Sequence, residues 1–172
     1  MTPLVVLVGP PGAGKSTVAQ LVADRLRADV RDTDLDVETS TGQLIADLFV
    51  DQGEPHFRDL EARAVEAALA EHRGVLALGG GAVLRESTRA ALLGHRVVFL
   101  DVGLAEAASR VGLNTARPLL LGNVRSQMKA LLDHRRPLYA QVADHVVHTD
   151  GLDPQEVADR VIAWLEDVRG LE

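Results

Sequence analysis

The sequence predicts an α/β fold with a central parallel sheet, because short apolar runs alternate with longer amphipathic stretches. Three runs are almost wholly apolar, as strands buried on both faces should be, at residues 4–8, 75–78 and 97–100. Weaker apolar patches around Val30 and at Val146-Val147 complete a set of five strands. Crossovers between parallel strands of one sheet are right-handed, so we expect the intervening helices to cover the sheet.

Helical patterns fill the segments between these strands. Residues 16–28 and 57–72 place apolar side chains three and four positions apart, which predicts two helices. The run Asp153-Pro154-Gln155-Glu156 predicts a third, with an N-cap residue, a proline in the first turn and a glutamate three residues after the cap. Residues 112–122 are the least regular region, and irregular loops of this length often act as lids.

Composition narrows the class of protein. A chain of 172 residues, 47% hydrophobic and 25% charged, is expected to form one domain (1–172). It contains no cysteine, which excludes disulfides and thiol catalysis. A formal charge of −7 and only five aromatic residues argue against a nucleic-acid partner. We also expect no membrane segment, because no apolar run is long enough to span one, and therefore a cytoplasmic protein.

The clearest motif directly follows the first predicted strand. Residues 9–17 read G-P-P-G-A-G-K-S-T, a phosphate-binding loop of the form G-x-x-x-x-G-K-[ST] that opens the first predicted helix. In such a loop, backbone N–H groups wrap a phosphate, the lysine reaches the β- and γ-phosphates, and the first hydroxyl ligates Mg²⁺. The residues expected to bind a nucleoside triphosphate are Gly12, Ala13, Gly14, Lys15, Ser16 and Thr17.

A pair of carboxylates follows the second predicted strand. Asp32 and Asp34 stand two positions apart, so an extended backbone would place them on one side. One carboxylate would hold Mg²⁺ through water while the other accepts a hydroxyl proton from a substrate. Asp32 is the better metal-side candidate, because the strand at 75–78 lacks the usual terminal aspartate. The alternative is a solvated acidic turn.

Glycines and arginines supply further candidates. Gly79, Gly80 and Gly81 end the strand at 75–78 and suit a backbone that comes close to a ligand, although a flexible turn is the alternative. Four arginines lie in or beside the irregular regions, at Arg58, Arg117, Arg135 and Arg136. A guanidinium binds carboxylates or phosphates bidentately, whereas an isolated surface arginine is usually only solvated.

Taken together, these motifs resemble the shikimate kinase family along nearly the whole chain. The matching segments are G-P-P-G-A-G-K-S-T (9–17), D-T-D (32–34), T-G-Q-L-I-A-D-L-F (41–49), G-E-P-H-F-R-D-L-E (53–61), L-G-G-G-A-V (78–83), N-T-A-R-P-L-L (114–120) and R-R-P-L-Y (135–139). The phosphate-binding loop alone is shared by many kinases, and the combination is far more specific.

The resemblance implies a nucleoside-monophosphate-kinase-like P-loop kinase fold, with a five-stranded parallel sheet of order 2-3-1-4-5 flanked by helices and a mobile lid. Residues 1–32 and 75–111 would form the core sheet with the nucleotide site, residues 33–61 the substrate-binding segment and residues 112–124 the lid. The implied activity is ATP-dependent phosphorylation of the shikimate 3-hydroxyl, toward chorismate and the aromatic amino acids. The implied partners are shikimate, ATP and Mg²⁺, and the chain is expected to be a monomer.

The resemblance also assigns roles by position. Lys15, Asp34 and Arg117 would be catalytic, with Asp34 at the acceptor hydroxyl and Arg117 reaching the phosphates from the lid. Shikimate would contact Asp34, Arg58, Gly79, Gly80, Gly81 and Arg135, and Ser16 and Asp32 would hold the metal. Arg110 would pack on the adenine.

Two departures from the family pattern leave local questions. Arg136 adjoins Arg135, so either arginine could hold the shikimate carboxylate. Leu152 stands where some members place a second arginine over the adenine. Three other functions stay open at this point: a gluconate kinase, a nucleoside-monophosphate kinase and a non-catalytic nucleotide-binding module.

Overall fold

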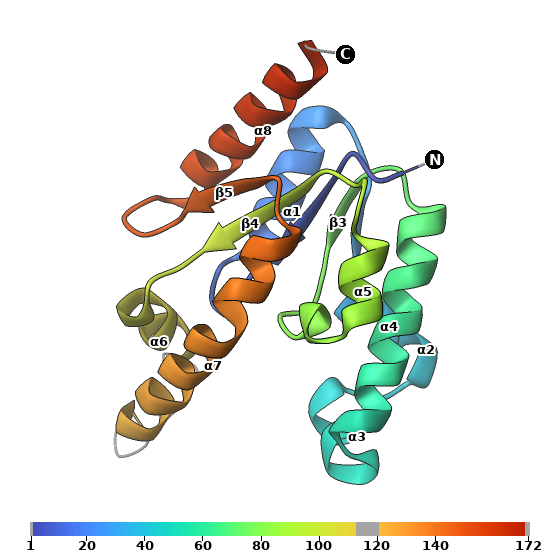
Figure 1. Cartoon of the computed structure of the whole chain (residues 1–172), viewed down its shortest axis with the longest axis vertical. Helices are drawn as coiled ribbons and strands as arrows, with labels where there is room; N and C mark the ends of the chain where they lie inside the picture. The colour runs from blue at the N-terminus through green and yellow to red at the C-terminus, as the bar shows by residue number, and fades with distance from the viewer. Residues whose placement is uncertain (1, 113–120, 171–172) are drawn as a thin grey trace.

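Five parallel strands form one twisted sheet at the centre of the computed structural model, which describes residues 2–112 and 121–170 (Figure 1). The strands are β1 (Val5–Val8), β2 (Val30–Asp32), β3 (Val75–Ala77), β4 (Val97–Asp101) and β5 (His145–His148), in the order β2-β3-β1-β4-β5. Both the strand order and the parallel pairing confirm the predicted fold class. The sheet extends beyond segments 1–32 and 75–111, because β5 forms one of its edges.

The helices connect these strands and cover both faces of the sheet. They are α1 (Lys15–Leu26), α2 (Thr33–Thr41), α3 (Ile45–Gln52), α4 (Glu54–Glu71), η1 (Ala82–Leu84), α5 (Glu86–Ala91), α6 (Leu104–Gly112), α7 (Leu121–Val142) and α8 (Pro154–Gly170). The capping box at α8 forms as predicted: the Asp153 N–H donates to Glu156 Oε2 (2.9 Å) and the Glu156 N–H to Asp153 Oδ1 (2.8 Å).

Alternation along the strands divides the core into two layers. Val5 and Leu7 of β1 face the layer that contains α1 and α8, whereas Val6 and Val8 face the layer that contains α4 and Tyr139 of α7. A third, smaller cluster joins the three helices of the 33–61 segment through Val37, Leu48 and Phe57. The strands β1 and β3, which lead into the candidate site, are therefore buried on both faces, and their carboxyl ends are held in fixed positions.

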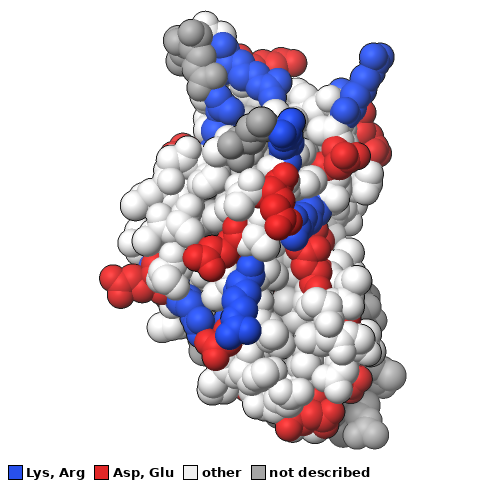
Figure 2. Space-filling view, turned by 90° about the vertical axis from the view of Figure 1, so that its right-hand side faces the viewer, with Lys and Arg blue, Asp and Glu red and all other residues white. Residues whose placement is uncertain are grey.

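The outer surface over α4 and α5 is mixed in charge (Figure 2). Arg31 pairs there with Glu71 (2.9 Å), and Arg85 pairs with Asp59 (2.6 Å). Among the described helices, none is long and apolar enough to cross a lipid bilayer. Much of the predicted lid, including Arg117, lies outside the described residues.

Candidate active site

The phosphate-binding loop follows β1, as its sequence predicts. Gly14 caps α1 in the left-handed region (φ 84°), a conformation that favours glycine. Lys15 Nζ donates to the carbonyl oxygens of Gly9 (2.7 Å) and Pro10 (3.1 Å), so the ammonium lies within the loop. Burial lowers the pKa of Lys15 to about 8, and the carboxylates of Asp34 and Asp32 partly oppose this shift.

Asp32 and Asp34 lie together, but for a different reason from the one predicted. The strand β2 ends at Asp32, and Asp34 belongs to the first turn of α2, so strand alternation does not place them. Asp32 is instead the N-cap of α2: its Oδ1 accepts the Asp34 N–H (2.9 Å), while its Oδ2 accepts the Ser16 hydroxyl (2.9 Å). The helix cap thus connects the phosphate-binding loop to the acidic pair.

The environment of Asp34 favours its neutral form. Burial raises the pKa of Asp34 to about 6, and the nearby carboxylates of Asp32 and Glu61 raise it further, against the opposing charge of Lys15. A carboxyl group with a pKa near neutrality is suited to accept a proton at working pH. Asp34 lies half-buried in a cavity that Gly12, Lys15 and Ser16 also line.

The three glycines after β3 allow site side chains to lie directly against the backbone. A methyl group on Gly79 would collide with Asp34 Oδ1 and Glu61 Oε2, and one on Gly81 would collide with the Arg58 guanidinium. Gly80 packs on Pro11 of the phosphate-binding loop. The sequence predicted a close approach to a ligand, and the structure shows close approach to the protein's own polar groups.

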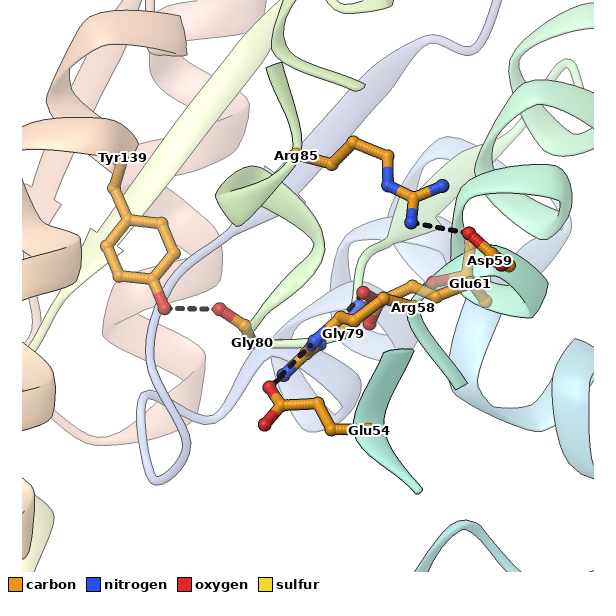
Figure 3. Close-up of polar contacts among 9 residues, drawn as sticks. Glu54, Arg58, Asp59, Glu61, Gly79, Gly80, Arg85 and Tyr139 are labelled. Atoms are coloured by element: carbon orange, nitrogen blue, oxygen red, sulfur yellow. Dashed lines mark hydrogen bonds and ion pairs between the residues drawn. The ribbon is translucent and has the colours of Figure 1, made fainter. Parts of the chain in front are cut away.

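Arg58 projects from α4 beside this glycine segment (Figure 3). Its Nη1 pairs with Glu61 (2.8 Å), and its Nη2 pairs with Glu54 (3.2 Å). The guanidinium also lies over the rings of Phe57 (5.2 Å) and Phe49 (5.9 Å). Glu61 is only 3% exposed, and the sequence analysis gave it no role although it ends the matching segment G-E-P-H-F-R-D-L-E (53–61). Its position one turn after Arg58 was the available signal.

The adjacent arginines of α7 point to different surroundings. Arg136 bonds away from the glycine segment, through Nε to Asp101 Oδ1 (3.3 Å) and through Nη2 to the Val102 carbonyl (3.3 Å). Arg135 lies close enough to Lys15 for its charge to add to the effect of burial, which lowers the pKa of Lys15, and close enough to Glu61 for its charge to oppose part of the rise that burial causes in the pKa of Glu61. The structure therefore brings Arg135, and not Arg136, to the cluster that contains Asp34 and Arg58.

A second cavity of about 260 Å³ also adjoins the phosphate-binding loop. Its lining residues are Ala13, Gly14, Thr17, Val18, Arg110, Thr149, Leu152, Pro154 and Val157. Arg110 donates to the Gly12 carbonyl (2.6 Å) and to Glu106 Oε2 (2.7 Å), and Glu106 Oε1 accepts the Gly151 N–H (2.8 Å). Arg110 and Leu152 therefore border one apolar pocket beside the loop, which suits a nucleotide base.

Comparison with known proteins decides the family. Residues 11–166 match the family model for shikimate kinase. Over 164 residues the chain is 60% identical to a shikimate kinase of Streptomyces avermitilis, with 95% of this chain and 96% of the relative covered. A shikimate kinase of Salinispora arenicola is 58% identical, with 96% and 99% covered. The chain belongs to the shikimate kinase family.

Structural similarity agrees with this membership. A shikimate kinase from Acinetobacter baumannii in complex with shikimate superposes with a TM-score of 0.89 at 31% identity, covering 97% of this chain and 94% of that one. A gluconokinase from Sinorhizobium meliloti reaches 0.61 at 19% identity, covering 97% and 93%, which shows a shared fold alone. As a member of the shikimate kinase family, the chain is a phosphotransferase that acts on an alcohol group, and ATP is its co-substrate.

Proposed function

We propose that this chain transfers the γ-phosphoryl group of ATP to the 3-hydroxyl of shikimate at the site between the phosphate-binding loop and Gly79–Gly81. The observation that carries the proposal is the placement of Asp34, which lies between Lys15, Glu61 and Gly79. Asp34 orients the acceptor hydroxyl and accepts its proton. In a loose phosphoryl-transfer transition state, such orientation supplies most of what a base contributes.

The nucleotide side of the proposal rests on Lys15 and the loop backbone. The loop from Gly12 to Thr17 binds the phosphates through backbone N–H groups, and Lys15 neutralises charge that builds up on the transferred group. Arg117 of the lid is proposed to reach the same phosphates. Arg110 packs on the adenine in the apolar pocket, where Leu152 provides contact without a second guanidinium.

Shikimate is a polyhydroxy carboxylate, and the acceptor side offers matching groups. Arg58 and Arg135 bind the carboxylate, and Gly79–Gly81 offer backbone groups for the hydroxyls. Glu61 and Glu54 hold Arg58 in place. Glu61 and Glu54 already compensate the charge of Arg58. Removing its guanidinium from water therefore costs little free energy before the substrate binds.

Mg²⁺ is the metal that this site fits. The Ser16 hydroxyl and the Asp32 carboxylate are 2.9 Å apart, and both are the oxygen ligands that Mg²⁺ prefers. These two residues would hold the ion, directly or through water, and the ion would neutralise charge on the β- and γ-phosphates. The proposal also includes a cytoplasmic location and a monomeric state.

The test is a coupled ADP-release assay with shikimate, gluconate and nucleoside monophosphates as acceptors. We expect turnover with shikimate and with neither of the others. Asp34→Asn should lower kcat strongly with a modest change in the KM for shikimate, because it keeps the shape of the side chain and removes the base. Asp36→Asn, two residues further along α2, is the matched control and should retain activity.

The pH profile adds a second readout. Asp34 must be ionised to accept the proton, so kcat/KM for shikimate should fall as the pH drops through about 6. Turnover of gluconate without turnover of shikimate would refute the proposed substrate. An Asp34→Asn variant with unchanged kcat would refute the proposed base.

A further inference from the structure

Tyr139 is the one tyrosine of the chain, and it is buried in α7 (1% exposed). Its ring packs on Phe99 of β4 with the centroids 5.0 Å apart. Its hydroxyl, however, leaves the apolar core and donates to the Gly80 carbonyl oxygen (Figure 3). A buried phenol hydroxyl needs a hydrogen-bond partner, and here that partner is a backbone carbonyl of the glycine segment beside the candidate site.

The glycine segment needs external restraint. Side chains cannot be added at Gly79 or Gly81 without collision, yet three glycines in a row lose more conformational freedom on folding than other residues do. Polar contacts restrain the segment instead. The Gly79 N–H donates to the buried Thr33 Oγ1 (3.2 Å), and the Gly79 and Gly81 carbonyls accept from Ala82 N and Leu84 N (both 3.1 Å).

Tyr139 supplies the remaining carbonyl partner, at Gly80. In a planar trans peptide the C=O of one residue and the N–H of the next point in opposite directions. Holding the Gly80 carbonyl toward α7 therefore turns the Gly81 N–H away from Tyr139. A side chain at Gly81 would meet the Arg58 guanidinium, so this peptide lies beside that arginine. Burial raises the pKa of Tyr139 to about 12, so its hydroxyl keeps the hydrogen that it donates throughout the working pH range.

The same side chain also adjoins the acceptor arginine. Tyr139 follows Arg135 by one helical turn in α7, and the Arg135 guanidinium lies close enough to the phenol for its charge to offset part of the burial effect on the Tyr139 pKa. The phenol thus lies beside the α7 arginine while it bonds the backbone after β3, and these two parts of the acceptor site are far apart in the sequence.

We propose that Tyr139 is a positioning residue for the acceptor, which fixes the Gly80–Gly81 peptide and the Arg135 side chain relative to each other before shikimate binds. The inference rests on the acceptor site proposed above. Without the hydroxyl, the binding-competent arrangement of the segment becomes one of several. The apparent affinity for shikimate is then reduced in proportion to the fraction of molecules that still adopt this arrangement. For the loss of one such hydrogen bond, we expect a reduction of about 5- to 10-fold.

The test compares Tyr139→Phe, which removes only the hydroxyl, with Phe99→Leu, which trims the packing of the ring and keeps the hydroxyl. For Tyr139→Phe we expect the KM for shikimate to rise about 5- to 10-fold, with the KM for ATP unchanged. Amide hydrogen exchange should become faster in residues 79–84 of the same variant. Phe99→Leu should lower the melting temperature and leave the KM for shikimate unchanged.

A KM for shikimate that is unchanged in Tyr139→Phe would overturn the proposal. A Tyr139→Phe variant in which the KM rises equally for ATP and shikimate would also overturn the proposal. An equal rise of the KM for shikimate in Phe99→Leu would do the same, because either result indicates general loosening of the core. Failure of the acceptor site itself is distinguishable, because it would appear as normal shikimate turnover in Asp34→Asn and Arg58→Ala. In that case, faster exchange at 79–84 in Tyr139→Phe would still support the restraint, and unchanged exchange would overturn it.

Discussion

Replacing Asp34 by asparagine is expected to inactivate the enzyme and, at the same time, to stabilise its fold. The pKa of Asp34 rises from 3.8 to about 6 in the folded chain, chiefly through burial. One pKa unit corresponds to about 1.4 kcal/mol, so the ionised carboxylate destabilises the folded state by about 3 kcal/mol at pH 7. Asparagine removes that charge in nearly the same volume.

The sign of the effect fixes its pH dependence. Because the folded state holds this proton more tightly than the unfolded chain, the contribution of Asp34 to stability falls as the pH rises from 3.8 to about 6. The stability gained by Asp34→Asn should therefore be about 3 kcal/mol at neutral pH and less than about 1 kcal/mol around pH 4. For a chain of this length, about 3 kcal/mol corresponds to a rise in melting temperature of roughly 6–12 °C.

Urea denaturation of wild type and variant at both pH values measures the difference in the free energy of unfolding. Asp36→Asn is again the control: Asp36 pairs with Arg31 (2.7 Å), so its loss should lower stability by up to about 1 kcal/mol. If Asp34→Asn is less stable than wild type at neutral pH, or gains equally at both pH values, the electrostatic reasoning about Asp34 is wrong.

Five further variants test the proposed roles. Lys15→Met should lower kcat by at least ~10²-fold and leave the KM for shikimate nearly intact, which steady-state kinetics will show. Arg58→Ala and Arg135→Ala should each weaken shikimate binding by about 2–5 kcal/mol in calorimetry, whereas Arg136→Ala should not, and equal effects of the last two would contradict the orientation of α7. Arg110→Ala should raise the KM for ATP by roughly 2- to 30-fold with kcat unchanged, and GTP should support measurable turnover, because neither Arg110 nor the apolar lining reads the purine edge. An unchanged KM for ATP would place the adenine elsewhere.

The sequence was most informative where the signals are local. Apolar runs identify strands that are buried on both faces, and residues 9–17 define their loop by spacing alone. The position of Asp34 was predicted for the wrong reason, since Asp32 is a favoured N-cap residue and the chain turns helical at Thr33. That preference for aspartate at helix starts was the signal that would have corrected the prediction.

Other parts of the site depend on packing that no local pattern contains. Neighbouring residues on a helix point about 100° apart, so the choice between Arg135 and Arg136 depends on how α7 rests on the sheet. The hydrogen bond between Tyr139 and Gly80 joins positions 59 residues apart, and no sequence pattern indicates that they are in contact. The same holds for Glu61 against Gly79, where a buried carboxylate of α4 lies against the backbone that follows β3.

The apolar pocket beside the phosphate-binding loop has a consequence for how the protein is made. Its walls include Pro154 and Val157 from α8, although the loop itself is at residues 9–17. Synthesis proceeds from the N-terminus, so the phosphate-binding loop leaves the ribosome long before α8, which forms part of the pocket wall. Val161 and Leu165 of α8 also complete one face of the core. A nascent chain that has not yet released α8 therefore lacks both the closed pocket and one face of the core.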